Sequence, residues 1–163
     1  MTPDRRRFLT IATTGGVAFA LFGCRDAAGA PEQFAFTLTD AEWKSKLPPA
    51  AYEVLRHEDT ERPGSSPLLG EHRAGTFSCA GCALPNFSSK TKFESNTGWP
   101  SFWKPLPGAV RTRRDGSIGF TRTEVHCSRC GGHLGHVFDD GPQPTGLRYC
   151  MNGAALSFKP GAA

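Results

Sequence analysis

The chain lacks a hydrophobic run long enough to cross a membrane as a helix. Its longest apolar segment, Phe8 to Phe22, has 15 residues, whereas a membrane-spanning helix needs about 20. A strong charge excess is also missing, because residues 31–163 carry 15 Lys and Arg against 13 Asp and Glu. Neither an internal repeat nor a long low-complexity linker divides these residues. We therefore expect one domain over residues 31–163, with its core at 38–159, and no nucleic-acid partner.

Residues 1–30 have the composition of an export signal. Arg5-Arg6-Arg7 precedes the apolar segment, a pattern typical of a twin-arginine signal peptide. The segment ends at Leu21-Phe22-Gly23-Cys24, which resembles a lipobox and predicts lipidation of Cys24. The alternative is cleavage after Ala30, which would release a soluble protein. We expect the protein in the periplasm of a bacterium, or held on the outer side of its cytoplasmic membrane by a lipid anchor alone.

Most cysteines of the remaining chain form two Cys-x-x-Cys pairs, Cys79/Cys82 and Cys127/Cys130. Four thiolates with these spacings are typical of one tetrahedral structural Zn²⁺ per chain. Two disulfides, or a redox-active pair, would also be compatible with export. A further alternative is a local metal site made of the second pair and two nearby histidines. We expect the four-cysteine zinc site to clamp two distant parts of one domain.

Helix signals are confined to residues 37–60. Thr39-x-x-Glu42 forms a capping box, and Pro48-Pro49 precedes a second short helix over Ala50 to Glu58. From Gly75 onward, Gly, Pro and Ser divide the chain into short runs rich in Phe, Val, Thr and Trp. Such runs are typical of strands and turns. The expected fold class is all-β, antiparallel, with short N-terminal helices.

One hairpin is predicted from local turn chemistry. Its strands would be Val110–Arg114 and Ser117–His126, joined by a primed turn at Asp115-Gly116, with Ile118 and Phe120 alternating along the second strand. Further turn signals separate three later strands, which we expect at His133–Phe138, Leu147–Met151 and Ala155–Lys159.

Cys150 is the one remaining thiol of the domain. Strand alternation places it on one face with Arg148 and Asn152, opposite the apolar residues of Leu147–Met151. A neighbouring guanidinium favours the thiolate, and a carboxamide can donate to a developing oxyanion. We therefore expect this face to line a cleft with Cys150 as a nucleophile. The alternative is a buried, inert thiol.

Two other segments could complete such a cleft. His133 and His136 offer imidazoles that exchange protons near neutral pH. Because they are three residues apart, both can reach one cleft only if Gly135 bends the strand. Thr97–Trp103 supplies an aromatic wall suited to a small apolar group, with Trp99 next to a stiff proline.

With these motifs the chain closely resembles the type B methionine sulfoxide reductases over residues 38–159. This resemblance implies a rolled, barrel-like domain of two antiparallel β-sheets with a four-cysteine zinc clamp. It also implies reduction of the R epimer of methionine sulfoxide in oxidised proteins. The matching motifs are Gly75-Thr-Phe-Ser-Cys79-Ala-Gly-Cys82, Thr97-Gly-Trp99-Pro-Ser-Phe102, Arg122-Thr-Glu-Val-His-Cys127-Ser-Arg-Cys130-Gly-Gly-His133-Leu-Gly-His136-Val-Phe138 and Arg148-Tyr-Cys150-Met-Asn152-Gly.

The resemblance further implies a reaction in which Cys150 attacks the sulfoxide sulfur. His136, helped by His133 and Asn152, would donate a proton to the oxygen. Methionine would leave, and Cys150 would become a sulfenic acid.

Substrate contacts are implied in the same way. Trp99 would hold the methyl group, with Phe138 as a second substrate-binding residue, and the mirror-image sulfoxide would bring oxygen into this apolar pocket. Arg148 would tune the nucleophile and order the cleft.

The chain departs from the family pattern at Thr97, where many members carry a resolving cysteine. We therefore predict that an external thioredoxin-like dithiol reduces the sulfenic acid directly, without an intramolecular disulfide. The protein is expected to be a monomer. Two alternative functions are a zinc-stabilised, non-catalytic binding module and an exported thiol oxidoreductase that uses Cys79 and Cys82.

Overall fold

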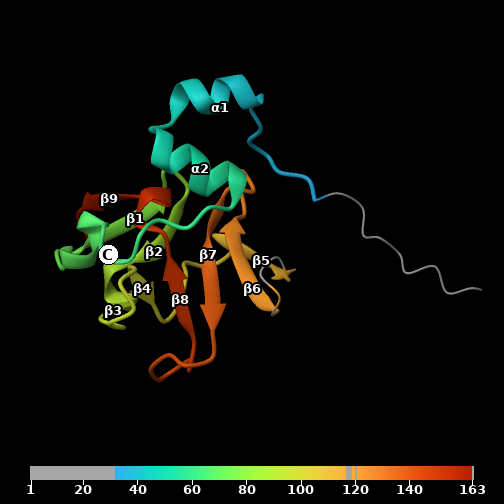
Figure 1. Ribbon diagram of the computed structural model, residues 1–163. Coiled ribbons are helices and arrows are strands. Elements are labelled where there is room, and N and C mark those ends of the chain that lie inside the picture. The colour runs from blue at the N-terminus through green and yellow to red at the C-terminus, as the bar shows by residue number, and fades with distance from the viewer. Residues whose placement is uncertain (1–31, 117–118, 120, 163) are drawn as a thin grey trace, which may run out of the picture. The chain divides into compact units, whose positions relative to one another are not determined.

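The computed structural model describes residues 32–116, 119 and 121–162. The expected signal peptide, including Cys24, lies outside the described residues. In these residues, the short helices α1 (Asp40–Lys46) and α2 (Pro49–His57) lie above the β-sheets (Figure 1). No helix in the described part of the chain has the length and apolar character needed to span a membrane.

The two N-terminal helices form where the local signals predict them. Helix α1 spans Asp40–Lys46, and its capping box is complete: the Thr39 side chain accepts from the Glu42 backbone, and the Glu42 side chain accepts from the Thr39 backbone. Helix α2 spans Pro49–His57 with proline in its first turn. Its apolar face packs on strand β7 (His133–Phe138) and on the 3₁₀ turn Gly153–Ala155, which follows strand β8 (Arg148–Met151).

In the described part of the chain, nine strands form two antiparallel sheets, as expected for the all-β class. The smaller sheet has the order β2-β1-β9, and the larger has the order β3-β4-β8-β7-β6-β5. Turns of 3₁₀ helix at Ser89–Thr91 and Gly153–Ala155 connect the sheets, and another at Pro67–Gly70 lies between α2 and β1. The strands are β1 Gly75–Cys79, β2 Pro85–Ser88, β3 Lys92–Phe93, β4 Ser101–Phe102, β5 Val110–Asp115, β6 Arg122–Cys127, β7 His133–Phe138, β8 Arg148–Met151 and β9 Leu156–Pro160.

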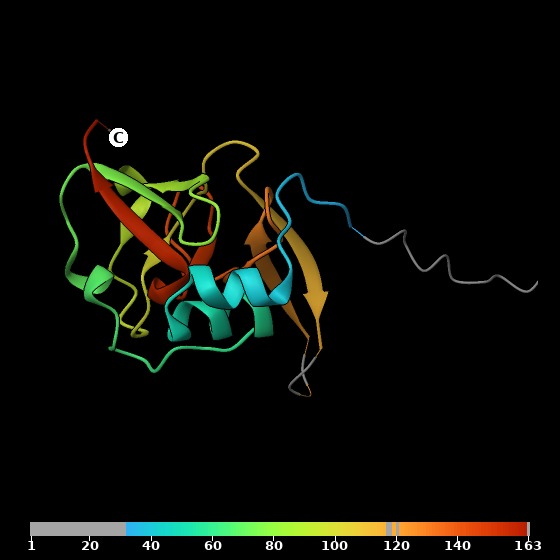
Figure 2. The same ribbon diagram turned by 90° about the horizontal axis from the view of Figure 1, so that it is seen from above.

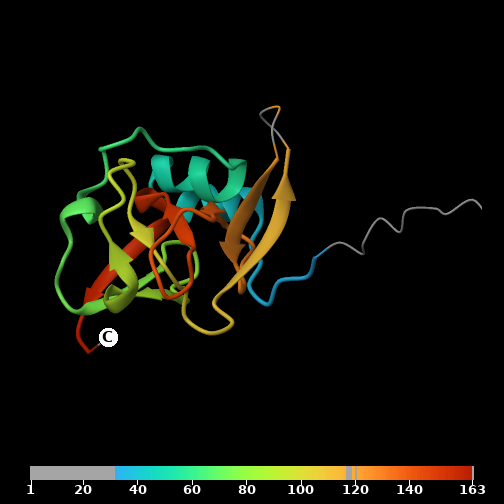
Figure 3. The same ribbon diagram turned by 90° about the horizontal axis from the view of Figure 1, so that it is seen from below.

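The β5–β6 hairpin differs from the prediction. It extends beyond the other strands at one end of the larger sheet (Figures 2 and 3). Asp115 pairs with Arg122, so the connection occupies residues 116–121 and the predicted primed turn at Asp115-Gly116 is wrong. The ladder continues through Asp115 because its carboxylate binds Arg122 Nη2 at 2.6 Å and His136 Nε2 at 2.7 Å. Ile118 and Phe120 lie outside the described residues.

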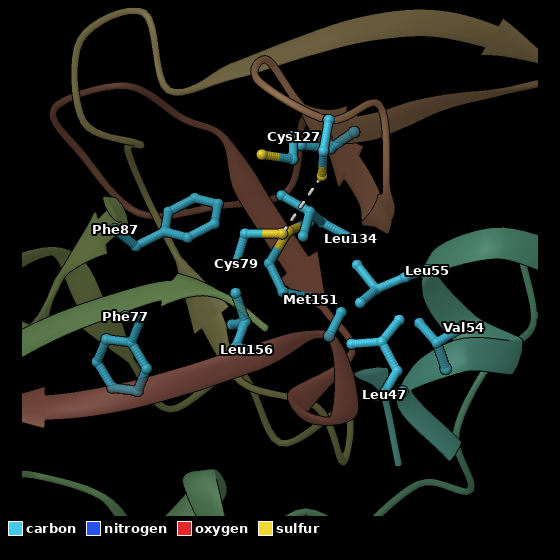
Figure 4. Packing of buried hydrophobic residues seen from close by; sticks show 14 of the residues in the cluster. Leu47, Val54, Leu55, Phe77, Cys79, Phe87, Cys127, Leu134, Met151 and Leu156 are labelled. Atoms are coloured by element: carbon cyan, nitrogen blue, oxygen red, sulfur yellow. Dashed lines mark hydrogen bonds between the residues drawn. The ribbon is translucent and has the colours of Figure 1, made fainter. Parts of the chain in front are cut away.

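The core lies between the helices and the two sheets. Figure 4 shows side chains of α2 and of both sheets meeting around Met151, which is fully buried. A second part of the core is aromatic: the Phe87 and Phe102 rings stack with centroids 4.4 Å apart, and Phe77 meets Phe102 edge-on at 5.0 Å. Each such side chain stabilises the fold by about 1.5–3 kcal/mol. This packing fixes β8, and Met151 faces the core as alternation predicts.

Candidate functional site

Four cysteine sulfur atoms meet where the two sheets come together. The Sγ atoms of Cys79, Cys82, Cys127 and Cys130 all lie within 4.8 Å of one another. Cys79 and Cys130 are 3.7 Å apart, and Cys82 and Cys127 are 3.5 Å apart. A tetrahedral Zn²⁺ with Zn–S bonds of about 2.3 Å separates its ligands by roughly 3.8 Å. The cluster therefore fits one tetrahedral metal ion that joins β1 to β6.

Two alternative arrangements of these thiols, two disulfides and a local site with two histidines, do not match the structure. All five described cysteines are free thiols. His133 and His136 each hydrogen-bond a carboxylate, at 2.8 and 2.7 Å, so neither completes a local site with the second Cys-x-x-Cys pair.

A cleft with a volume of about 150 Å³ opens at the larger sheet. It brings together five of the predicted site residues: Trp99, His136, Phe138, Cys150 and Asn152. Of the remaining predicted residues, neither His133 nor Arg148 contributes to its wall. Its other lining residues are Thr60, Arg122 and Gly135.

Cys150 and His136 face each other across two neighbouring strands. They are directly paired in the ladder between β8 and β7. Side chains of residues directly opposite in an antiparallel pair lie on the same face of the sheet. Because both residues also line the cleft, the thiol and the imidazole can reach the same molecule bound there.

A β-bulge in β7 turns both histidines toward the same region. Val125 pairs with Gly135 and His126 with His133, so one extra residue lies between these two positions of β7. As a result, the rings of His133 and His136 meet edge-on with centroids 5.3 Å apart. The bend expected at Gly135 is present, but only His136 lines the cleft, and His133 lies behind it.

Only glycine fits at position 135. Its φ is +154°, and a Cβ would lie 2.1 Å from the carbonyl oxygen of Cys150. Such a contact is impossible without separating β7 from β8.

His136 is buried and held by a carboxylate. Its Nε2 donates to Asp115 Oδ2 at 2.7 Å, and the same oxygen accepts from Arg122 Nη2 at 2.6 Å. Burial is the main cause that lowers the pKa of His136 below its usual value, and the charges of Arg122 and His133 act in the same direction. The Asp115 hydrogen bond opposes this shift. Asp115 therefore stabilises the protonated form of His136 at a position where burial destabilises it.

His133 lies behind His136 and has its own carboxylate. Its Nδ1 donates to Glu124 Oε1 at 2.8 Å, and Arg113 also pairs with this buried glutamate. Burial acts to raise the pKa of Glu124, but the nearby His126 imidazole, with Nδ1 3.7 Å from Oε2, the hydrogen bond from His133 and the charge of Arg113 outweigh it and hold the pKa well below its usual value. His133 thus acts on the cleft through His136.

Arg148 forms a bidentate ion pair outside the cleft. Its Nε and Nη2 each donate to one Asp140 oxygen at 2.8 Å, and its guanidinium lies 4.4 Å from the centre of the Phe138 ring. The pKa of Arg148 is raised, chiefly by the Asp140 hydrogen bond, with a smaller contribution from Cys150. Arg148 therefore fixes Phe138 in the cleft wall.

Glu61, which the sequence did not indicate, ties three parts of the site together. Its carboxylate accepts from the backbone N–H groups of Gly153 and Ala154. Its backbone N–H donates to Asn152 Oδ1, and its carbonyl accepts from Trp99 Nε1, each at 3.0 Å. Asn152 and Trp99 are thereby held beside Cys150.

Thr97 is in contact with the thiol. Its Oγ1 lies 3.7 Å from Cys150 Sγ. A side chain at this position is therefore close enough to act on the nucleophile.

Glu61, Thr60, Asp115, Arg122 and Glu124 were all missed as site residues. The first two follow a helix in a segment without regular structure, and no local pattern signals their contacts. The acidic and basic residues at the ends of β5 and β6 offered one signal, because cross-strand carboxylate–guanidinium pairs stabilise a hairpin.

Comparison with known proteins agrees with this geometry. The model of the SelR domain matches residues 47–160. The peptide methionine sulfoxide reductase MsrB of Thiobacillus denitrificans is 54% identical over 75% of this chain and 93% of its own. MsrB of Agrobacterium fabrum is 50% identical over 75% and 91%, and MsrB of Methanosarcina barkeri is 52% identical over 78% and 90%. Since the family model spans the described sheets and the cleft, and relatives at 50% identity or more cover most of their own length, the chain belongs to the SelR-domain family of type B methionine sulfoxide reductases.

Proposed function

We propose that the protein reduces the R epimer of methionine sulfoxide in oxidised proteins to methionine, as a peptide-methionine (R)-S-oxide reductase. The observation that carries this proposal is the direct pairing of Cys150 with His136 in one cleft, within a chain of this family. The test is steady-state turnover of separated R and S epimers of capped methionine sulfoxide, with dithiothreitol as reductant. Turnover of the R epimer alone supports the proposal, whereas no turnover by metal-loaded protein would favour a binding module.

The reaction balances as transfer of one oxygen atom between two sulfur atoms. Cys150 sulfur attacks the sulfoxide sulfur while the His136 imidazolium gives its proton to the oxygen, which forms an S–S-bonded adduct that carries a hydroxyl group. The hydroxyl then passes to the Cys150 sulfur as the S–S and S–O bonds of the substrate sulfur break and methionine leaves. The substrate sulfur is reduced to a thioether, and Cys150 is oxidised to a sulfenic acid. Asn152, held by Glu61, is placed to donate to the oxygen, and His133 packs edge-on against His136 and orients its ring.

The aromatic wall gives the site its preference for one epimer. Trp99 and Phe138 line the same cleft as Cys150, and both are anchored by partners outside it. A methyl group of the R epimer would lie against these rings. The S epimer would place its polar oxygen there, without a hydrogen-bond donor from the rings themselves.

Regeneration of Cys150 requires an external dithiol of the thioredoxin type. The dithiol is oxidised to a disulfide, the sulfenic oxygen leaves as water, and the thiol is restored. Two observations support direct reduction: Thr97 occupies the position next to Cys150 Sγ, and the other described cysteines belong to the metal cluster. An R-sulfoxide-dependent assay with thioredoxin, its reductase and NADPH tests this step.

The metal ion is inferred to be structural Zn²⁺. Four thiolate ligands are the donor set that zinc prefers, and their separations fit its tetrahedral radius. Metal analysis of the purified protein should give one zinc atom per chain.

The proposal that the protein is exported rests on its sequence alone. Residues 1–30 would serve as a twin-arginine signal, with either lipidation at Cys24 or cleavage after Ala30. Mass determination of the mature N-terminus from a bacterial membrane fraction and a periplasmic fraction would separate these outcomes. The monomeric state stays a prediction.

A further inference from the structure

Three hydroxyl groups connect the sulfur of Cys150 to a backbone carbonyl. Thr97 Oγ1 lies 3.7 Å from Cys150 Sγ and 2.8 Å from Ser95 Oγ. Ser95 Oγ lies 2.7 Å from Ser101 Oγ, which donates to the carbonyl oxygen of Trp99 at 3.1 Å. Ser101 is buried and pairs with Cys150 in the ladder between β4 and β8. We call Thr97, Ser95 and Ser101 the hydroxyl chain.

The carbonyl end fixes the direction of the hydrogen bonds. A carbonyl oxygen only accepts, and each hydroxyl has one hydrogen to donate. Since Ser101 gives its hydrogen to Trp99, Ser95 must donate to Ser101, and Thr97 must donate to Ser95. Thr97 is left facing Cys150 with a lone pair, which matches a neutral thiol that donates its S–H.

Ionisation of Cys150 requires the opposite direction. A thiolate only accepts, so Thr97 must turn its hydrogen toward the sulfur. Ser95 then donates to Thr97, Ser101 donates to Ser95, and the Trp99 carbonyl loses its Ser101 donor. The carbonyl and the thiolate therefore compete for the same hydrogens, although a hydrogen bond to a charged acceptor is about twice as strong as a neutral one.

We propose that the hydroxyl chain sets how readily Cys150 ionises: Thr97 stabilises the thiolate, and the Ser101–Trp99 bond restrains Thr97 from doing so. Thr97 is then a catalytic residue of this chain, and Ser95 and Ser101 are positioning residues that act through it. The catalytic consequence rests on the proposed function of Cys150 as the nucleophile. The ionisable groups near the sulfur, Arg148 and His136, are not themselves altered by substitutions in the hydroxyl chain.

The test is the rate at which iodoacetamide alkylates Cys150 in the metal-loaded protein at pH 7, followed by mass spectrometry of the peptide that contains it. Removing the restraint with Ser101→Ala frees Thr97 to donate to the sulfur. Alkylation should become about fivefold faster, as expected for the loss of one competing neutral hydrogen bond. Ser95→Ala is a milder variant, because Ser95 is only half-buried, and should have the same effect.

Thr97 variants show whether the effect passes through the hydroxyl chain. Thr97→Val, which keeps the shape and removes the hydroxyl, should slow alkylation, and Thr97→Ser should restore the rate of the unmodified chain. In the Thr97→Val background, Ser101→Ala should no longer accelerate the reaction. Equal acceleration by Ser101→Ala with Val or Thr at position 97, or none with either, would overturn the proposal.

Alkylation needs no sulfoxide, so the two proposals fail separately. Absent reductase activity with the predicted alkylation pattern would overturn the proposed function and leave the hydroxyl chain in place. R-epimer turnover with identical alkylation rates in all variants would do the reverse.

Discussion

The carboxylate of Asp115 accepts a hydrogen bond from His136 Nε2 at 2.7 Å. Asp115 lies on β5, which does not border β7 and contributes no lining residue to the cleft. The bond opposes the lowering of the His136 pKa by burial. A charged carboxylate at this distance stabilises the protonated imidazole that a proton donor needs. Asp115 thus belongs to the site, although it does not line the cleft.

Replacing this carboxylate should change the pH dependence of turnover. A proton donor must be protonated, so activity falls as pH rises through the pKa of His136. Asp115→Asn removes a cause that raises this pKa and should shift the falling limb of kcat/KM to lower pH. At pH 7.5 we expect kcat/KM to fall by about tenfold or more, a loss within the range that general acid catalysis usually contributes. A pH profile of R-epimer reduction checks this.

The matched control for Asp115→Asn is Asp59→Asn, which neutralises an exposed carboxylate outside the sheets. Its profile should match that of the unmodified chain. If Asp115→Asn lowered activity equally at every pH, the role of Asp115 would be structural.

A methyl group at Gly135 should separate the two strands that carry the nucleophile and the proton donor. In Gly135→Ala the new Cβ would lie 2.1 Å from the Cys150 carbonyl oxygen. We expect a loss of about 1–3 kcal/mol in the free energy of unfolding, measured with urea, together with loss of R-epimer turnover. Gly70→Ala is the control, because nothing lies within 4 Å of its Cβ. Unaltered turnover in Gly135→Ala would contradict the close strand pairing.

Metal removal should destabilise the whole domain. The cysteine cluster joins the end of β1 in one sheet to the end of β6 in the other. Metal binding at such a site is coupled to folding. Chelation should therefore lower the free energy of unfolding by several kcal/mol and Tm by on the order of 10 °C. Calorimetry before and after chelation, and after return of one equivalent of Zn²⁺, checks this. A Tm that does not change on verified metal loss would show that the clamp contributes nothing.

Glu124 should make the fold sensitive to acid. The pKa of Glu124 in the folded state lies below its usual value of 4.5. Its contribution to the free energy of unfolding is therefore fully present above pH 4.5 and is lost as the pH falls toward the pKa of the folded state. Glu124→Gln should therefore destabilise the protein at pH 7, and the difference from the unmodified chain should shrink toward pH 3. Urea unfolding at the two pH values measures this. Taking the difference between the chains cancels the loss of metal at low pH, which both share.

Local signals were sufficient for the helices and most strands. The capping box at Thr39 and the strand at His133–Phe138 depend on neighbouring residues, and both formed as predicted. The cysteine cluster and the bend at Gly135 also followed from spacing and sterics. These features could be predicted because the interactions that decide them are encoded within a few residues or by one metal.

Interactions between distant segments were not predictable in this way. Asp115-Gly116 has the composition of a tight turn, yet Arg122 and His136 draw Asp115 into the ladder. Glu61 contacts groups more than 90 residues further along the chain. Alternation correctly gave Arg148 the side of the strand that carries Cys150, but Asp140 holds its guanidinium outside the cleft wall.

Central to this mechanism is the proposal that Cys150 accepts the sulfoxide oxygen and remains a sulfenic acid until an external dithiol reduces it. Its most direct test is the intact mass of the protein after one equivalent of R-epimer substrate without reductant. We predict a species heavier by one oxygen, located at Cys150, absent with the S epimer and absent in Cys150→Ser. A species lighter by two hydrogens, or oxygen retained in Cys150→Ser, would contradict the account.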